Sequence, residues 1–222
     1  MRNLLVLGAI AAAAATPAFA QEAAAPASAV TVTGNVSLVT DYAWRNVSQS
    51  NQDMTVQGGF DVAVDGGFYA GLWASGVDFN DGDDTNLEVD LYGGYGFEAA
   101  GLGFDVGFIY YAYPDAETAD LNFYEIYGGV SKEWGAFGLG GTLSYDPDNE
   151  TTYADVSASY AITDAFSVAA GYGKYLDGFG EYGGYNVGAT YSAGGLDFGL
   201  SYYDNDISGS DDNVVFSIGK AL

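Results

Sequence analysis

A period-two alternation of apolar and polar residues recurs from Val32 to the end of the chain. In its first occurrence Val36 and Leu38 alternate with Asn35 and Ser37, which is the spacing of a β-strand whose two faces meet different surroundings. About twelve such segments of about ten residues follow one another, and this is the length of strand that crosses a bilayer when tilted. The pattern predicts an all-β fold, a single antiparallel transmembrane β-barrel of about 12 strands.

The predicted strands differ in how regular their alternation is. In the first strand we place Tyr42 and Trp44 on the apolar face, and Asp41 and Arg45 on the polar face. The segments with clear alternation are 32–45, 54–64, 87–95, 104–110, 139–145, 156–160, 185–191 and 198–202, and the less regular ones are 68–77, 122–132, 165–174 and 213–222.

The first twenty residues have the organisation of a secretory signal peptide. Arg2 gives a positive start, residues 4–16 form an apolar run, and Ala18-Phe19-Ala20 is a small-residue cleavage site. We expect cleavage after Ala20, a flexible lead-in over residues 21–29 and a barrel over residues 30–222. After Val30, polar or charged residues interrupt every apolar run, so an exported chain that enters a membrane must do so as a closed barrel.

The connections between the predicted strands fall into two alternating classes. A soluble sandwich would also alternate, but its turns would not divide in this way. Short periplasmic turns and longer extracellular loops are typical of bacterial outer-membrane barrels. The short links are 65–67, 98–101, 133–136, 161–164 and 192–195, and the longer, acidic links are 80–86, 114–120, 146–151, 175–182 and 204–212. We therefore expect a bacterial outer-membrane location, with the acidic links outside.

Charge and residue types exclude several functions. The formal net charge is −25, from 30 acidic and 5 basic residues, so the chain cannot concentrate the Lys and Arg that a nucleic-acid partner needs. Cysteine and histidine are absent, which removes thiolate chemistry, the usual general base and the commonest metal ligand. The pair Glu88 and Asp90 has the composition of a glycosidase site, but we interpret it as lumen lining. We expect no enzyme activity, no catalytic residue and no cofactor.

Two further segments have alternative interpretations. The acidic run from Asp78 to Asp84 suggests calcium, but its spacing differs from that of a calcium-binding loop. We predict no metal site there and leave weak divalent binding as the alternative. We assign Tyr110, Tyr111 and Tyr113 to an aromatic girdle at the membrane interface. A track on which sugars stack is the other possibility.

The polar faces of the predicted strands carry most of the charge that a lumen would have. Arg45 is the one basic residue that we assign to the lumen, since Lys132, Lys174 and Lys220 lie near strand ends. Rings of carboxylates favour cations in a channel, so the pattern predicts a cation-preferring lumen. The acidic residues assigned to it are Asp41, Asp53, Asp61, Glu88, Asp90, Asp105, Asp155 and Asp197.

Several segments are familiar beyond their pattern, namely residues 37–62 (SLVTDYAWRNVSQSNQDMTVQGGFDV), 67–79, 88–98, 107–116 and 122–131. They resemble the TorF-family putative porins of proteobacteria. Members often carry Y-x-F-R-G-x-S, and this chain has Tyr42-Ala-Trp-Arg-Asn-Val-Ser48, with Asn46 in place of glycine. Asparagine also tolerates a left-handed backbone. The resemblance implies a porin-like barrel and brings no catalytic residue or established substrate.

The function that these observations favour is passive diffusion of small polar solutes through an outer-membrane channel. Glycine, alanine and serine are frequent on the predicted inward face, which favours an opening, while about twelve strands is an intermediate size. A structural or surface-interaction barrel with a filled lumen is the alternative. The expected partners are outer-membrane lipid, small polar solutes or cations, and the barrel insertion machinery, although the chain ends in Leu222 where many barrels end in an aromatic residue.

Overall fold

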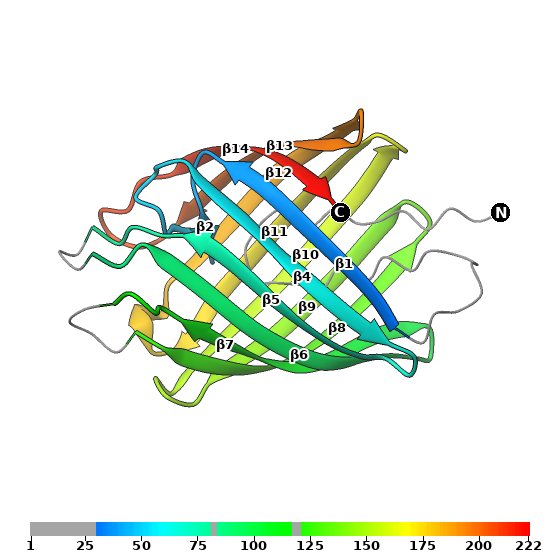
Figure 1. The fold of residues 1–222 in the computed structure, drawn as a ribbon, viewed down its shortest axis with the longest axis horizontal. Helices are drawn as coiled ribbons and strands as arrows, with labels where there is room; N and C mark the ends of the chain where they lie inside the picture. Colours follow the sequence, from blue (N-terminus) through cyan, green and yellow to red (C-terminus); the bar gives the residue numbers. More distant parts are fainter. Residues whose placement is uncertain (1–29, 81–83, 117–120) are drawn as a thin grey trace.

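The barrel is a closed ring of twelve antiparallel strands (Figure 1). The computed structural model describes residues 30–80, 84–116 and 121–222. Around the ring the order is β1, β14, β13, β12, β11, β10, β9, β8, β7, β6, β5 and β4. The strands are β1 (Val30–Val39), β4 (Thr55–Val64), β5 (Phe68–Gly76), β6 (Leu87–Ala99), β7 (Leu102–Ala112), β8 (Phe123–Trp134), β9 (Phe137–Asp146), β10 (Thr151–Thr163), β11 (Phe166–Asp177), β12 (Gly183–Ala193), β13 (Leu196–Asn205) and β14 (Asn213–Ala221).

The predicted barrel and its strand number are confirmed, including the four less regular segments, which form β5, β8, β11 and β14. The ring closes where β1 pairs with β14, from Asn35 opposite Ala221 to Val39 opposite Ser217. The backbone N–H of Leu222 adds a hydrogen bond of 2.8 Å to the carbonyl oxygen of Gly34. The expected signal peptide and lead-in lie outside the described residues. Among the residues that the structure describes, no helix is long and apolar enough to span a membrane.

Alternating residues of each strand face the outside and the inside of the ring. In β4, Val56 and Phe60 are 58% and 56% exposed, whereas Gln57 between them is 4% exposed. A strand places successive side chains on opposite faces, so this difference separates an apolar outer surface from a polar interior. The outer surface is the kind that a bilayer requires.

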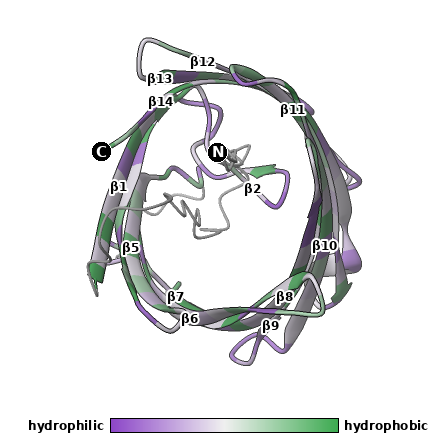
Figure 2. Ribbon diagram, turned by 90° about the vertical axis from the view of Figure 1, so that its right-hand side faces the viewer, coloured by the Kyte–Doolittle hydropathy of each residue, from purple (hydrophilic) through white to green (hydrophobic). Residues whose placement is uncertain are grey.

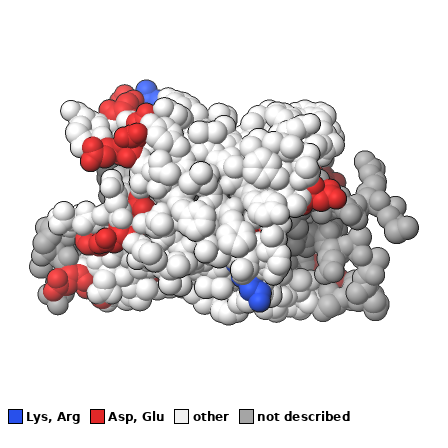
Figure 3. All heavy atoms as spheres, turned by 90° about the horizontal axis from the view of Figure 1, so that it is seen from above, with Lys and Arg blue, Asp and Glu red and all other residues white. Residues whose placement is uncertain are grey.

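The two ends of the ring differ in their connections, as predicted. At one end the links are tight turns, such as Ala100-Gly101 between β6 and β7, where both residues have positive φ (54° and 74°). Two-residue hairpins favour this left-handed geometry. The longer links meet at the other end. Figure 3 shows Asp and Glu gathered at the ends of the visible face, with the larger group at the long-link end.

The link between β1 and β4 folds into the ring, where the sequence pattern predicts a longer first strand. It contains a two-stranded hairpin, β2 (Ala43–Trp44) and β3 (Val47–Ser48), and Figure 2 shows β2 inside the ring. The prediction that the first strand runs to Arg45, with Tyr42 on the outer face, is therefore wrong. Tyr42 is 2% exposed and lies in the interior. Alternation continues through the link because the hairpin also has two faces.

Candidate functional site

The hairpin of residues 40–54 is the central feature of the interior. Its turn consists of Arg45 and Asn46, with φ of 49° and 66°. Both residues are left-handed, as expected for a tight two-residue turn, and the sequence-based expectation for Asn46 is confirmed. At the base, Asp41 accepts hydrogen bonds from the hydroxyls of Ser48 and Ser50, both at 2.7 Å. The hairpin is thus a closed unit with its own internal contacts.

The hairpin spans the full width of the ring. At its base, Asp41 accepts a hydrogen bond from Asn213 at the start of β14. At its tip, Arg45 contacts Glu125 in β8. The path from β14 to β8 through β13, β12, β11, β10 and β9 takes six steps in a ring of twelve strands. These two strands are therefore opposite each other, and the hairpin crosses the interior between them.

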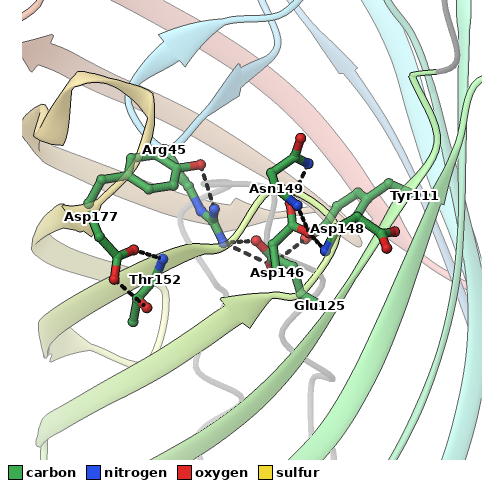
Figure 4. Close-up of polar contacts among 9 residues, drawn as sticks. Arg45, Tyr111, Glu125, Asp146, Asp148, Asn149, Thr152 and Asp177 are labelled. Carbon is green, nitrogen blue, oxygen red and sulfur yellow. Dashed lines mark hydrogen bonds and ion pairs between the residues drawn. The ribbon is translucent and has the colours of Figure 1, made fainter.

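Arg45 is held in a socket of one carboxylate and several aromatic rings, and Figure 4 shows its contact with Glu125. Its Nη2 donates to both oxygens of Glu125, at 2.7 and 2.8 Å, and its Nη1 donates to the hydroxyl of Tyr175 at 2.6 Å. The guanidinium carbon lies 4.2 Å from the ring centres of Trp44 and Tyr153. Burial alone lowers the pKa of Arg45, but Glu125 and the tyrosines raise it by more, so it stays charged. Arg45, at the tip of the hairpin, is thus both ion-paired with a carboxylate and stacked against aromatic rings.

One side of the hairpin packs against β5 to β7. The hydroxyl of Tyr42 donates to Glu88 at 2.7 Å, and the hydroxyl of Tyr113 donates to the other oxygen of Glu88 at 2.8 Å. The ring of Tyr42 meets Trp73 edge-on at 5.4 Å. Burial, followed by the charge of Glu88, raises the pKa of Tyr42 well above its ordinary value, so its hydroxyl remains a donor. Trp44 packs edge-on against Tyr111 at 5.9 Å.

The other side of the hairpin meets β12 and β13. The side-chain oxygen of Asn46 accepts a hydrogen bond of 2.9 Å from the amide of Asn186. The main-chain oxygen of Asn46 accepts one of 2.8 Å from the side chain of Asn205. Ala43 packs in a small apolar cluster with Tyr203 and neighbouring residues. The hairpin is therefore braced on both flanks as well as at its tip.

Three buried carboxylates lie beside the hairpin in the long-link half of the ring. Glu88, Asp90 and Glu125 are each 2–3% exposed. Glu88 accepts hydrogen bonds from two tyrosine hydroxyls. Glu125 accepts hydrogen bonds from Arg45 and Tyr111. Within the described ranges, Asp90 Oδ1 and Trp44 Nε1 are buried without a hydrogen-bond partner. A buried polar atom without a partner costs free energy, so this arrangement of the interior is strained at these two atoms.

A second layer of carboxylates and tyrosines lies toward the tight-turn end. Tyr92 donates to Asp61 at 2.5 Å. Tyr69 donates to Asp105 at 2.9 Å, and its oxygen also meets the hydroxyl of Tyr127. These residues lie on β4 to β8, on the same wall as the three buried carboxylates. Below the hairpin, this wall thus carries carboxylates paired with tyrosines, while the opposite wall carries Asp155 on β10.

Tyrosine rings of this wall lie over glycines on the neighbouring strand. A Cβ at Gly71 would lie 2.4 Å from the ring of Tyr92, and one at Gly94 would lie 2.3 Å from the hydroxyl of Tyr69. Gly71 is opposite Tyr92 in the β5–β6 register, and Gly94 is opposite Tyr69. The missing side chains let the rings lie flat along the wall, so they line the interior without filling it.

The wall formed by β9 to β14 is lined mainly by small neutral residues below the hairpin. Glycine, alanine, serine and threonine alternate there with the exposed apolar residues, which confirms the sequence-based assignment of small residues to the inward face. The small inward residues include Gly140, Thr142, Ser157, Ser159, Ala169, Gly171, Gly188, Thr190, Gly199, Ser201 and Ser217.

The carboxylates predicted to line the lumen occupy different places. Asp61, Glu88, Asp90, Asp105 and Asp155 are on the inward faces of β4, β6, β7 and β10. Their role in selectivity stays a prediction.

Asp41 is in the hairpin base, and Asp53 is an exposed residue of the same link, so neither belongs to a strand as expected. Asp197 shares the inward face of β13 with Gly199 and Ser201, but it is exposed near the tight-turn end, where it accepts a hydrogen bond from Ser192. The alternation rule fails for Asp41 and Asp53 because it cannot detect where a strand leaves the sheet.

Sequence reasoning missed the partner of Arg45. Glu125 lies in the less regular segment 122–132, and its inward position was detectable only from the apolar neighbours Tyr124 and Ile126, which are exposed. Tyr110 lies on the outer surface, as the girdle assignment requires, and is 38% exposed. The assignment is wrong for Tyr111 and Tyr113. These two lie inside, at 2% and 9% exposure. Tyr111 packs against Trp44 of the hairpin, and the hydroxyl of Tyr113 donates to Glu88 of β6.

Residues 81–83 of the acidic run considered for calcium lie outside the described residues. In the parts of the chain that are described, no group of three or more carboxylates is arranged to hold a metal ion.

Comparison with protein families gives one match. Residues 23–219 match a family described as a bacterial protein of unknown function, Gcw_chp. The chain belongs to this Gcw_chp family. No curated protein matches the sequence. Since the family's function is not known, membership assigns no activity.

Outer-membrane porins and a channel are among the solved structures with a similar fold. The KdgM porin superposes with a TM-score of 0.63 at 8% identity, covering 86% of this chain and 98% of the porin. The NanC porin gives a TM-score of 0.57 at 12% identity, with the same coverage of both chains. An outer-membrane channel from Pseudomonas putida F1 gives 0.52 at 12% identity, covering 89% and 96%. At these identities the likeness concerns the fold.

Proposed function

We propose that this Gcw_chp member is an outer-membrane channel for passive diffusion of small polar solutes, with a preference for cations. The observation that carries the proposal is the two-walled interior. One wall has small neutral side chains that leave space, and the other has carboxylates held in place by tyrosine hydroxyls. Fixed carboxylates in a confined, low-dielectric passage attract cations and repel anions. The channel fold of the structural relatives supports the same proposal.

The proposed membrane setting rests on the outer surface and the two kinds of link. Exposed apolar residues cover the outside of the strands, and we assign the tight turns to the periplasm and the acidic links to the cell exterior. The resemblance to TorF-family porins and an export signal over residues 1–20 are part of this proposal. With Ser210→Cys, an impermeant thiol reagent should label intact cells, and labelling only after lysis would reverse the orientation.

A filled, non-transporting barrel is the second candidate, and the hairpin favours it. Residues 40–54 cross the interior between opposite strands, as a permanent internal support would. The two candidates differ in whether solute crosses the barrel.

Solute flux into liposomes separates the two candidates. Purified full-length protein is reconstituted into liposomes loaded with an impermeant polymer, and swelling is followed in isotonic solutions of small sugars and amino acids of each charge. A channel gives swelling that is fastest for small cationic solutes and slows as solute size increases. Swelling no faster than that of protein-free liposomes would reject the channel and support the filled barrel.

A further inference from the structure

The hairpin that crosses the barrel has features of a movable element. We propose that residues 40–54 form a retractable plug, held by Arg45, over a layer of three carboxylates, Glu88, Asp90 and Glu125, which attracts cations into the passage once the plug is released. This inference rests on the proposed channel function and deepens it. In the plugged arrangement the hairpin closes the long-link half of the interior. In the released arrangement the carboxylates behind it face the passage.

The way the hairpin is attached permits release. β2 and β3 pair with each other in a separate two-stranded sheet and do not join the ring. Side chains hold the tip and flanks, through Arg45, Tyr42 and Asn46. Backbone contacts with the ring and its links are found near the base, where Thr40 donates to Phe216 and Ser50 is bridged to Asp78. A small set of side-chain contacts can therefore break while the twelve-stranded ring stays intact.

The base of the hairpin also contains a candidate hinge. Asn51 and Gln52 are exposed and have φ of 54° and 62°. Left-handed backbone is unfavourable for glutamine, whereas asparagine accepts it more readily. The backbone of these two residues can leave the left-handed conformation when the hairpin moves. The hinge lies at the long-link end, so the hairpin can swing toward that end of the ring.

The carboxylates behind the hairpin oppose the plugged position that Arg45 stabilises. Arg45 supplies one positive charge, while Glu88, Asp90 and Glu125 carry three carboxylates. Asp90 Oδ1 has no hydrogen-bond partner among the described residues, and the side chain is 2% exposed. A buried polar oxygen without a hydrogen-bond partner costs free energy, and hydration removes that cost. The Arg45 socket thus stabilises the plugged state, and the unpaired oxygen of Asp90 opposes it.

The test is a reversible crosslink between the hairpin and the wall. The chain has no cysteine, so Asn46→Cys with Asn186→Cys introduces a unique thiol pair where the two side chains are hydrogen-bonded at 2.9 Å. A short reducible bis-thiosulfonate reagent joins them in the plugged arrangement. Single-channel conductance is recorded in planar bilayers before the reagent, after it, and after reduction. Each single variant, treated in the same way, is the control.

We expect the crosslink to lower mean current at least tenfold and reduction to restore it, with no change in the single variants. Equal currents in the crosslinked and reduced states would overturn the plug and leave the channel standing. An absence of current in every state, wild type included, would overturn both the plug and the proposed function.

A second variant tests the carboxylate layer and does not depend on the crosslink. Asp90→Leu removes the unpaired buried oxygen and keeps the approximate size of the side chain. We expect the substitution to stabilise the plugged state and so to lower the ratio of open to closed time tenfold, which corresponds to about 1.4 kcal/mol. We also expect weaker selectivity for potassium over chloride in the open periods. Unchanged gating and selectivity would remove Asp90 from the proposal.

Discussion

At the residue scale, the interior depends on Arg45 and its socket. Arg45 is 8% exposed and Glu125 is 3% exposed, so the ion pair that joins them is almost fully buried. Such a pair contributes little net stability compared with an apolar replacement, because both charges are desolvated. Removing one partner has a different effect, since the remaining charge stays buried without compensation.

We predict that Glu125→Gln lowers the free energy of unfolding by about 3 kcal/mol. Urea unfolding of the reconstituted barrel, followed by tryptophan fluorescence, measures the change. Glu133→Gln is the matched control because Glu133 is exposed near the other end of the same strand, and a change within about 0.5 kcal/mol is expected there. Equal effects of the two substitutions would show that the ion pair does not hold the hairpin.

The sequence predicts that Arg45 lies inside but cannot identify its partner. Alternation assigns a residue to one face of a strand, and this was sufficient for Asp61, Glu88 and Asp105. It does not say which residues of distant strands meet across the interior. The contact between Arg45 and Glu125 joins residues 80 positions apart, and it depends on how a link folds within the ring. The alternation of apolar and polar residues carries no information on how this link folds.

At the element scale, the twelve strands follow from the sequence and the hairpin does not. The strands were predictable because each has an apolar face and a length suited to a bilayer. In the link between β1 and β4 the alternation continues, so Tyr42 and Trp44 have the pattern of outward residues. They face inside because Arg45 and Asn46 make a left-handed turn. Asn46 is a common turn residue, but Arg45 is not, so the pair gives only a weak turn signal.

Pairs of strands also determine how open the interior is. Tyr92 of β6 lies over Gly71 of β5, where an added Cβ would lie 2.4 Å from its ring. We predict that Gly71→Ala lifts this ring from the wall, breaks its hydrogen bond to Asp61 and lowers open-channel conductance at least twofold. Overpacking of this kind also costs about 1–3 kcal/mol of stability. Gly128→Ala is the control, since no atom lies within 4 Å of the added Cβ. Identical conductance of both variants would argue against rings lying along the passage.

At the scale of the whole molecule, the barrel has an uneven distribution of charge. The chain carries a formal net charge of −25, and acidic residues gather in the long links and on one wall of the interior. An electric field of this kind should enrich cations at the mouth and within the passage. Salt screens it, because the Debye length falls from about 10 Å at 0.1 M to about 3 Å at 1 M.

The reversal potential of the channel under a potassium chloride gradient tests the central claim most directly. Purified protein in a planar bilayer is measured at low and at high salt, together with the double variant Asp61→Asn, Asp105→Asn. We predict a reversal potential of the cation-selective sign that declines as salt rises and moves toward zero in the double variant. A reversal potential of the anion-selective sign, or one unaffected by loss of these carboxylates and by salt, would contradict the account.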